Sequence, residues 1–236
     1  MAEECFSRTA ALLGEAALEK LKNSHVMLFG LGGVGSYVCE ALVRSGVGKL
    51  TLVDFDTVSE SNRNRQLFAL GSTVGMKKVD VAAARAKDIS PYVQIDTCAV
   101  FVDAASAEAL IAAARPDYVV DAIDTVSGKL GIISASHAQG IPVLSCMGTG
   151  NKLDPTRFRI SDIGKTHTCP LARAMRTALR HAGISHVEVL WSDELPHTAE
   201  NVPTESGKPI PASVAFVPSA AGLIMAGHVI RKLAEI

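Results

Sequence analysis

The feature that most constrains the fold is a glycine-rich turn between an apolar strand pattern and a helix pattern. The turn, residues 30–35 (GLGGVG), follows an apolar run at 26–29 and precedes a helical pattern that starts near Val34. The first glycine permits the sharp bend, the second lets a phosphate approach the backbone, and the last allows close helix–strand packing. Backbone N–H groups and the positive helix end then face an anion. The turn predicts a nucleotide-binding α/β fold with phosphates at Gly30, Gly32, Gly33 and Gly35.

The remaining chain alternates strand and helix patterns. Strands are expected near 26–30, 50–54, 93–98, 118–124 and 141–146, and helices near 34–46, 76–88, 104–114 and 128–139. This order predicts right-handed crossovers and a Rossmann-like, mostly parallel sheet with helices on both faces. In the C-terminal part, short strands near 157–161, 187–191 and 213–217 are expected to extend the sheet antiparallel, before a helix over 220–233.

Length and composition favour one domain over residues 1–236, because a chain of this size has room for one sizeable core. Residues 1–22 form an N-terminal helical segment by their apolar spacing, and the proline-containing segment 192–212 is predicted to be a flexible loop. The apolar runs are strand-sized or interrupted by charge, and the N-terminus lacks the pattern of a secretion signal. We therefore expect a cytoplasmic protein with no membrane partner.

Charged side chains follow the predicted strands where a nucleotide would lie. Asp54 ends the second apolar run and is placed to accept hydrogen bonds from ribose hydroxyls. Arg65 and Lys78 add more positive charge than a dinucleotide needs, which suits a triphosphate with a leaving pyrophosphate. Asp124 closes the 118–124 strand and can ligate magnesium or polarise the attacking group. The predicted nucleotide contacts are the four glycines with Asp54, Asp56, Asn62, Arg65 and Lys78.

This constellation resembles the ATP site of the ThiF/MoeB/HesA superfamily, the adenylating relatives of ubiquitin-activating enzymes. The resemblance implies ATP and Mg²⁺ as cofactors, with Arg65 as an arginine finger, Lys78 on phosphate and Asp124 as the catalytic, magnesium-associated aspartate. The segment Phe6-Ser-Arg8 is similar to the superfamily's N-terminal arginine motif. It implies a homodimer in which Arg8 reaches the triphosphate of the neighbouring subunit as a further catalytic residue.

Motifs beyond the ATP site are similar to the tRNA threonylcarbamoyladenosine dehydratase branch of the superfamily. They include residues 154–156 (DPT), 162–166 (DIGKT) and 169–172 (CPLA). This similarity implies ATP-dependent cyclisation of threonylcarbamoyladenosine in tRNA, in which the threonyl carboxylate is adenylated and the amide closes a ring with loss of AMP. It implies tRNA as a partner and leaves open a cysteine-desulfurase partner for sulfur transfer.

Two alternatives stay open. One is an adenylyltransferase that activates the C-terminus of a ubiquitin-like sulfur-carrier protein. The lack of Cys-x-x-Cys pairs, which usually hold zinc in that branch, weighs against it. The other is an NAD-binding oxidoreductase or non-catalytic nucleotide-binding protein that uses only the glycine turn and Asp54. Arg65 and Lys78 weigh against this alternative, because hydride transfer does not need them.

Cys169 and a nearby basic cluster each have two interpretations. Cys169 precedes Pro170 at the start of a helix predicted over 170–181, where a helix N-terminus can lower a thiol pKa, but a buried structural thiol is favoured. The net charge of −1 excludes nucleic-acid binding by bulk charge alone. A solvated basic face and an RNA-backbone contact both remain open for the local cations, which are Arg157, Arg159, Lys165, Arg173, Arg176 and Arg180.

Overall fold

The strand order places the glycine turn near the middle of a seven-stranded sheet. The computed structural model describes residues 3–198 and 211–236. The strands lie in the order β3-β2-β1-β4-β5-β7-β6, parallel except for β6, which runs antiparallel to β7. Their bounds are β1 (His25–Phe29), β2 (Lys49–Val53), β3 (Gln94–Cys98), β4 (Tyr118–Asp121), β5 (Val143–Cys146), β6 (Phe158–Asp162) and β7 (Glu188–Ser192). The predicted fold class is confirmed, although β7 itself pairs with β5 in parallel.

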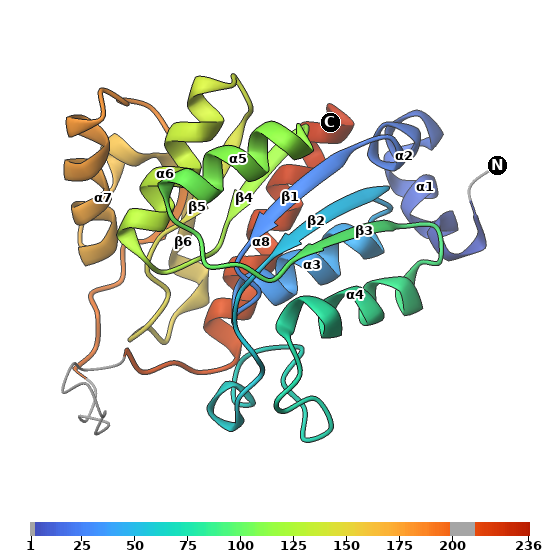
Figure 1. The fold of residues 1–236 in the computed structure, drawn as a ribbon, viewed down its shortest axis with the longest axis horizontal. Helices are drawn as coiled ribbons and strands as arrows, with labels where there is room; N and C mark the ends of the chain where they lie inside the picture. The colour runs from blue at the N-terminus through green and yellow to red at the C-terminus, as the bar shows by residue number, and fades with distance from the viewer. Residues whose placement is uncertain (1–2, 199–210) are drawn as a thin grey trace.

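Helices cover both faces of the sheet (Figure 1). Helix α8 packs on α2 and α3. Helix α4 also packs on α3, whereas α6 packs on α5 and α7. The bounds are α1 (Ser7–Leu13), α2 (Glu15–Lys22), α3 (Gly35–Arg44), α4 (Lys78–Ile89), α5 (Ala104–Ala114), α6 (Val126–Ala138), α7 (Pro170–His181) and α8 (Phe216–Ala234). The helices predicted at 104–114 and 170–181 match these bounds.

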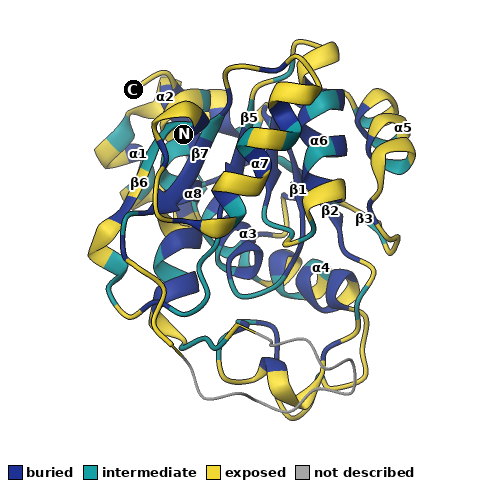
Figure 2. Cartoon of the chain, turned by 90° about the vertical axis from the view of Figure 1, so that its left-hand side faces the viewer, coloured by how far each residue is buried: buried dark blue, intermediate teal, exposed yellow. Residues whose placement is uncertain are grey.

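Strand β1 shows why the sheet needs two helical layers. Val26 and Leu28 belong to the core formed with α3, α4 and α8, whereas Met27 and Phe29 belong to the core formed with α5 and α6. Successive strand side chains point to opposite faces, so a continuous apolar run must be covered on both sides. Figure 2 shows the result, with buried strands between helices whose outer faces are exposed. No helix within the described ranges is long and apolar enough to cross a membrane.

The predicted strand at 213–217 is wrong. Residues 211–214 have no regular structure, and α8 begins at Phe216 instead of Ala220. Pro218 lies in the first turn of this helix, where a missing backbone N–H is tolerated, whereas a central strand would lose a hydrogen bond there. Gly222 then lets α8 approach α3 closely, because a Cβ at this position would lie 2.4 Å from the Val34 carbonyl oxygen.

Three boundaries also differ from prediction. Strand β4 ends at Asp121, so Asp124 lies in the connection to α6 and not at the strand end. The N-terminal helical segment is divided into α1 and α2 at Gly14, whose φ of 90° no helix accommodates. The predicted loop 192–212 begins inside β7 and has irregular backbone at 193–198, but residues 199–210 lie outside the described ranges.

Candidate active site

A pocket of about 650 Å³ lies at the carboxyl ends of the parallel strands. In open α/β sheets this edge is where ligands bind. Nine of the residues predicted from sequence line the pocket, namely Gly30, Gly32, Gly33, Asp54, Asp56, Asn62, Arg65, Lys78 and Asp124. The fold therefore brings together residues from the end of β1 to the connection after β4, which are separated in the chain by α3, β2, α4, β3, α5 and β4.

The glycine turn has the backbone geometry expected of a phosphate loop. Gly30 has φ 87°, and a Cβ there would lie 2.8 Å from the Ala122 carbonyl oxygen, so only glycine fits. Gly35 does not line the pocket. A Cβ at Gly35 would lie 1.8 Å from the Gly30 carbonyl oxygen, so this glycine serves helix–strand packing. The N-terminus of α3 consequently starts directly behind the loop, where its dipole favours an anion.

Asp54 is fixed by two backbone N–H groups, one from the glycine turn and one from the segment that follows β2. Its Oδ2 accepts a hydrogen bond from Leu31 N at 2.6 Å, and its Oδ1 accepts one from Asp56 N at 2.9 Å. Burial raises the pKa of this carboxyl group, while the Lys78 ammonium and the two backbone donors oppose that rise. Each carboxylate oxygen keeps further acceptor capacity, so a ribose diol can bind without displacing these contacts.

Two cations face the same cavity with different restraints. Lys78 is buried at the start of α4, and its Nζ lies 2.8 Å from Asp56 Oδ2. Arg65 is half-buried and donates from Nη1 to the Ser61 carbonyl at 2.9 Å and to Asn64 Oδ1 at 2.8 Å. Neither of these two Arg65 acceptors is a carboxylate. The positive charge of the guanidinium is therefore not neutralised by them and can pair with a polyanionic ligand.

Asn62 and Asp124 complete the polar wall of the pocket. Asn62 is buried, and its Oδ1 accepts from Ser59 N at 3.2 Å, so its amide NH₂ is the group free to donate to a ligand. Asp124 is exposed and has no hydrogen bond or ion pair within residues 3–198 and 211–236. Those ranges hold no cluster of three or more His, Cys, Asp or Glu side chains arranged for a metal ion. A single available carboxylate suits Mg²⁺ that is shared with phosphates, because this ion retains several waters.

An apolar wall of the pocket was missed by sequence reasoning. Val100 and Phe101 follow β3 and line the cavity together with Phe55. The rings of Phe55 and Phe101 meet edge to face with centroids 5.1 Å apart, and both residues are about half exposed. Exposed aromatic side chains in a pocket offer a surface on which a flat base can lie, and these lie beside Asp54, the carboxylate predicted to bind ribose. Their position in an irregular connection left no periodic signal.

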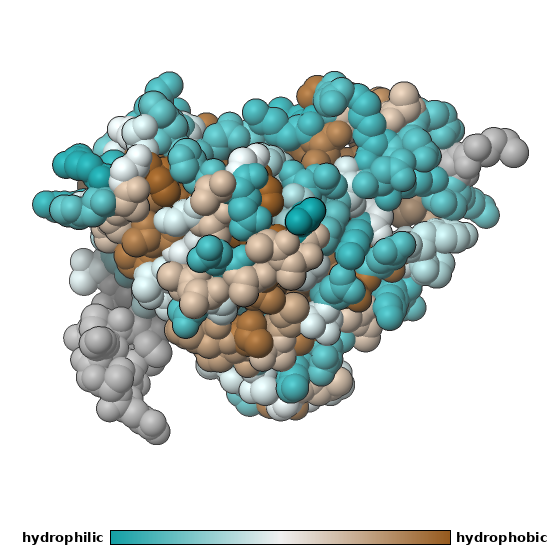
Figure 3. Space-filling model, turned by 45° about the horizontal axis from the view of Figure 1, so that its top comes forward, coloured by the Kyte–Doolittle hydropathy of each residue, from teal (hydrophilic) through white to brown (hydrophobic). Residues whose placement is uncertain are grey.

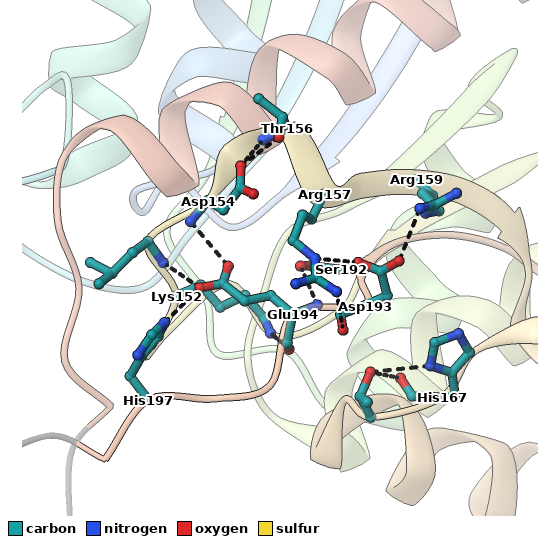
Figure 4. Close-up of polar contacts among 12 residues, drawn as sticks. Lys152, Asp154, Thr156, Arg157, Arg159, His167, Ser192, Asp193, Glu194 and His197 are labelled. Atoms are coloured by element: carbon teal, nitrogen blue, oxygen red, sulfur yellow. Dashed lines mark hydrogen bonds and ion pairs between the residues drawn. The ribbon is translucent and has the colours of Figure 1, made fainter.

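The far wall of the pocket carries a buried lysine that sequence reasoning also missed. Lys152 is 3% exposed and donates from Nζ to the Glu194 carbonyl oxygen at 2.7 Å (Figure 4). The Glu194 carboxylate is held separately by Leu153 N at 2.9 Å, Asp154 N at 3.1 Å and His197 Nε2 at 2.9 Å. Burial lowers the pKa of Lys152, against the opposing effects of Cys169 and Glu194. This end of the pocket therefore holds a poorly solvated cation.

Cys169 is buried and lines the pocket beside this lysine. It stands directly before α7, and a Cβ at Gly148 would lie 3.4 Å from its Sγ. Cys39 and Cys146 behave as structural thiols, because burial raises the pKa of each to about 12. Cys146 and Cys169 both line the pocket, whereas Cys39 does not.

A buried ionic network lies beneath the pocket at the ends of β4 and β5. Lys129 Nζ is 3.0 Å from Asp121 Oδ2, Ser145 Oγ donates to the same oxygen at 2.5 Å, and all three residues are fully buried. Asp121 Oδ1 accepts from Ile123 N at 3.2 Å. The one sequence signal for this network was a carboxylate within the apolar run of β4. A charge buried in such a strand requires a partner.

Arg8 lies apart from the pocket. It is exposed on α1 and does not line the cavity. The structure therefore places eight of the predicted contacts and Asp124 together, leaves Gly35 in a packing role, and leaves Arg8 outside the site of its own chain.

Comparison with known proteins agrees with this geometry. The ThiF family model matches residues 6–236. The chain is 47% identical to the tRNA threonylcarbamoyladenosine dehydratase of Bacillus subtilis (strain 168), over 97% of this chain and 94% of that protein. Crystal structures of Escherichia coli TcdA in complex with ATP and with AMP each superpose with a TM-score of 0.88. They are 31% and 32% identical, respectively, and cover 98% of this chain and 93% and 94% of theirs. The chain belongs to the ThiF family.

Proposed function

We propose that this protein is one adenylating domain that dehydrates threonylcarbamoyladenosine in tRNA at the expense of ATP. The observation that carries the proposal is the pocket itself, in which the phosphate turn and two cations occupy one wall and the buried Lys152 the other. The similar proteins of Bacillus subtilis and Escherichia coli carry this activity in their names, and one Escherichia coli structure contains ATP.

ATP lies with its ribose on Asp54, its base against Phe55 and Phe101, and its phosphates on the glycine turn. Arg65 and Lys78 hold the triphosphate, so that the charge developing on the leaving pyrophosphate meets fixed cations. Asp124 would hold a Mg²⁺ ion, which would further neutralise phosphate charge. This division explains why the pocket gathers more positive charge than a dinucleotide requires.

The threonyl carboxylate approaches from the opposite wall, where Lys152 attracts it. A carboxylate oxygen forms a bond to the α-phosphorus while the bond to pyrophosphate breaks, giving an acyl-adenylate. The urea oxygen of the substrate then attacks the activated acyl carbon, AMP leaves, and a urea N–H proton is lost. No side-chain nucleophile is needed, because the substrate closes a ring on itself. The protein's task is to hold two anions in line.

Mass spectrometry of nucleosides tests this function. tRNA carrying threonylcarbamoyladenosine is incubated with the protein and ATP, and the modified nucleoside is expected to lose one water. If threonylcarbamoyladenosine kept its mass while the protein adenylated a ubiquitin-like carrier, the result would favour the adenylyltransferase alternative. Isothermal titration adds a second measurement, in which magnesium–ATP binds more tightly than NAD. Preference for NAD would contradict adenylation altogether.

We also propose a homodimer in which Arg8 of one subunit reaches the triphosphate of the other. A cation supplied across a twofold interface makes each site depend on both subunits. Mixing inactive Arg8→Ala with inactive Asp124→Ala protein should restore activity, since one site of each heterodimer has both residues intact. Failure of rescue despite verified subunit exchange would show that Arg8 does not act across an interface.

Two further assignments belong to the proposal. A cytoplasmic location agrees with the five cysteines being free, as expected in a reducing compartment. The cysteine-desulfurase partner stays a prediction from the resemblance, and Cys169 is the thiol whose behaviour tests it.

A further inference from the structure

A second hollow opens next to the reaction pocket along helix α7. It has a volume of about 720 Å³ and is lined by Arg173, Arg176 and Thr177 of the helix together with Thr168. Cys169 and Pro170 line both this groove and the reaction pocket, so the two are continuous at the start of α7. Figure 2 shows the outer face of α7 turned to solvent. A molecule whose reactive end enters the pocket can therefore lie along this helix.

The charged residues that line the groove, Arg173 and Arg176, are both cations, and Arg180 follows them on the same helix. Helix α7 contains no acidic residue, and it carries Arg173, Arg176 and Arg180 at helical spacings of three and four. These spacings place the three arginines on one face, with about 10 Å along the axis from the first to the last. The adjacent face of the helix is buried through Ala172, Met175 and Leu179, each of which directly precedes one of the arginines. Figure 3 shows strongly hydrophilic side chains at the left-hand edge of the molecule, where α7 lies in Figure 1.

The arginines of α7 differ from those of the neighbouring strand in their partners. Arg157 and Arg159 pair with Asp193 at 2.7 and 2.9 Å (Figure 4). Arg173 and Arg180 are exposed and form no ion pair within the described part of the chain. Arg176 donates to the carbonyl of Thr166 at 2.9 Å, a neutral acceptor. Within the predicted basic cluster, Arg157 directly before β6 and Arg159 on β6 therefore share the Asp193 carboxylate, whereas the α7 arginines have no carboxylate partner among the described residues.

We infer that the α7 groove holds the phosphate backbone of the RNA whose modified nucleoside enters the reaction pocket. This inference rests on the proposed function and deepens it by assigning the RNA-docking surface. A chain with net charge −1 binds a polyanion only where cations are locally unopposed. Guanidinium groups suit phosphate because they donate two parallel hydrogen bonds. Contacts of this kind position the RNA without reading its sequence, so the pocket keeps the task of selecting the nucleoside.

Binding of fluorescently labelled tRNA, measured by anisotropy at several salt concentrations, tests this surface. The Arg173→Ala/Arg180→Ala double variant is expected to bind at least about tenfold more weakly, with a salt slope smaller by about two. Its affinity for ATP should stay that of the wild type. The matched control is Lys87→Ala/Arg231→Ala, which removes two exposed cations from α4 and α8 outside both hollows.

Circular dichroism melting establishes that both double variants are folded. Equal tRNA affinity and salt slope in the α7 variant, the control and the wild type would overturn the inference. If the wild type dehydrates tRNA while the α7 variant keeps its KM for tRNA, the docking surface is wrong and the proposed function stands. If the wild type neither binds nor dehydrates tRNA, both are wrong. Loss of binding to an acidic carrier protein instead of tRNA would likewise overturn the RNA assignment.

Discussion

The two walls of the reaction pocket are built in different ways. The nucleotide wall is assembled from short sequence motifs whose contacts join residues 22 or 23 positions apart, such as Asp54 with Leu31 N and Lys78 with Asp56. The opposite wall depends on contacts between distant segments, such as Lys152 with Glu194. A wall made from sequence motifs can be predicted from the sequence. A wall made from contacts between more distant residues can be identified only in the folded structure.

The buried network of Asp121, Lys129 and Ser145 lies beneath the pocket at the ends of β4 and β5, and its loss has the largest expected effect. Lys129→Met leaves an uncompensated buried carboxylate, which should lower the free energy of unfolding by about 3–5 kcal/mol. Urea denaturation measures this, with the single tryptophan, Trp191, reporting the far wall and circular dichroism reporting the whole sheet. Coincident transitions would show that both walls unfold as one unit.

The control for this prediction is the double variant Asp121→Asn/Lys129→Met. It removes both charges but keeps an acceptor for Ser145, so much of the lost stability should return. A Lys129→Met protein as stable as the wild type would contradict the network's role. Separate transitions for the two probes would instead show that the walls are independent units.

The same contrast decides what could be predicted from sequence. The strands and helices of the parallel part were predicted within a few residues, because apolar runs between helical patterns specify crossovers directly. The strand at 213–217 was wrong, since an apolar stretch that opens a helix at Phe216 has the same composition as a short strand. Lys152 gave no signal, because a lone lysine is ordinary until burial removes its solvent. Asp121 gave a weak signal, because it is a carboxylate in an apolar strand.

On the nucleotide wall, Arg65→Ala and Asp124→Ala should each reduce turnover by roughly a hundredfold or more. Under the proposed function both residues act on charge that develops as pyrophosphate leaves, so ATP affinity should change much less than turnover. Single-turnover kinetics and isothermal titration separate the two effects. An Arg65→Ala or Asp124→Ala enzyme that turns over like the wild type would remove that residue from the assigned chemistry.

On the opposite wall, Lys152→Gln should raise the KM for modified tRNA by about tenfold, because a hydrogen bond to a charged group is weakened. ATP affinity should be unchanged, since we propose that the nucleotide lies on the other wall. Lys87→Gln on the exposed surface of α4 is the matched control. If Lys152→Gln weakened ATP binding and left the KM for tRNA unchanged, the two walls would not divide their ligands as proposed.

Cys169 gives the smallest expected effect on chemistry and the sharpest test of how the far wall works. Its thiol is buried beside Lys152, but a substrate that cyclises on itself needs no covalent intermediate. Cys169→Ser should therefore keep its turnover, while the buried hydroxyl lowers the free energy of unfolding by about 1–3 kcal/mol. Cys169→Ala, which buries no polar atom, should keep turnover with a smaller loss of stability. Steady-state rates and urea denaturation measure the two quantities separately. A folded but inactive Cys169→Ser enzyme would mean that the thiol takes part in a covalent or persulfide step. That result would bring the cysteine-desulfurase partner into the mechanism. The far wall would then take part in catalysis as well as in substrate binding.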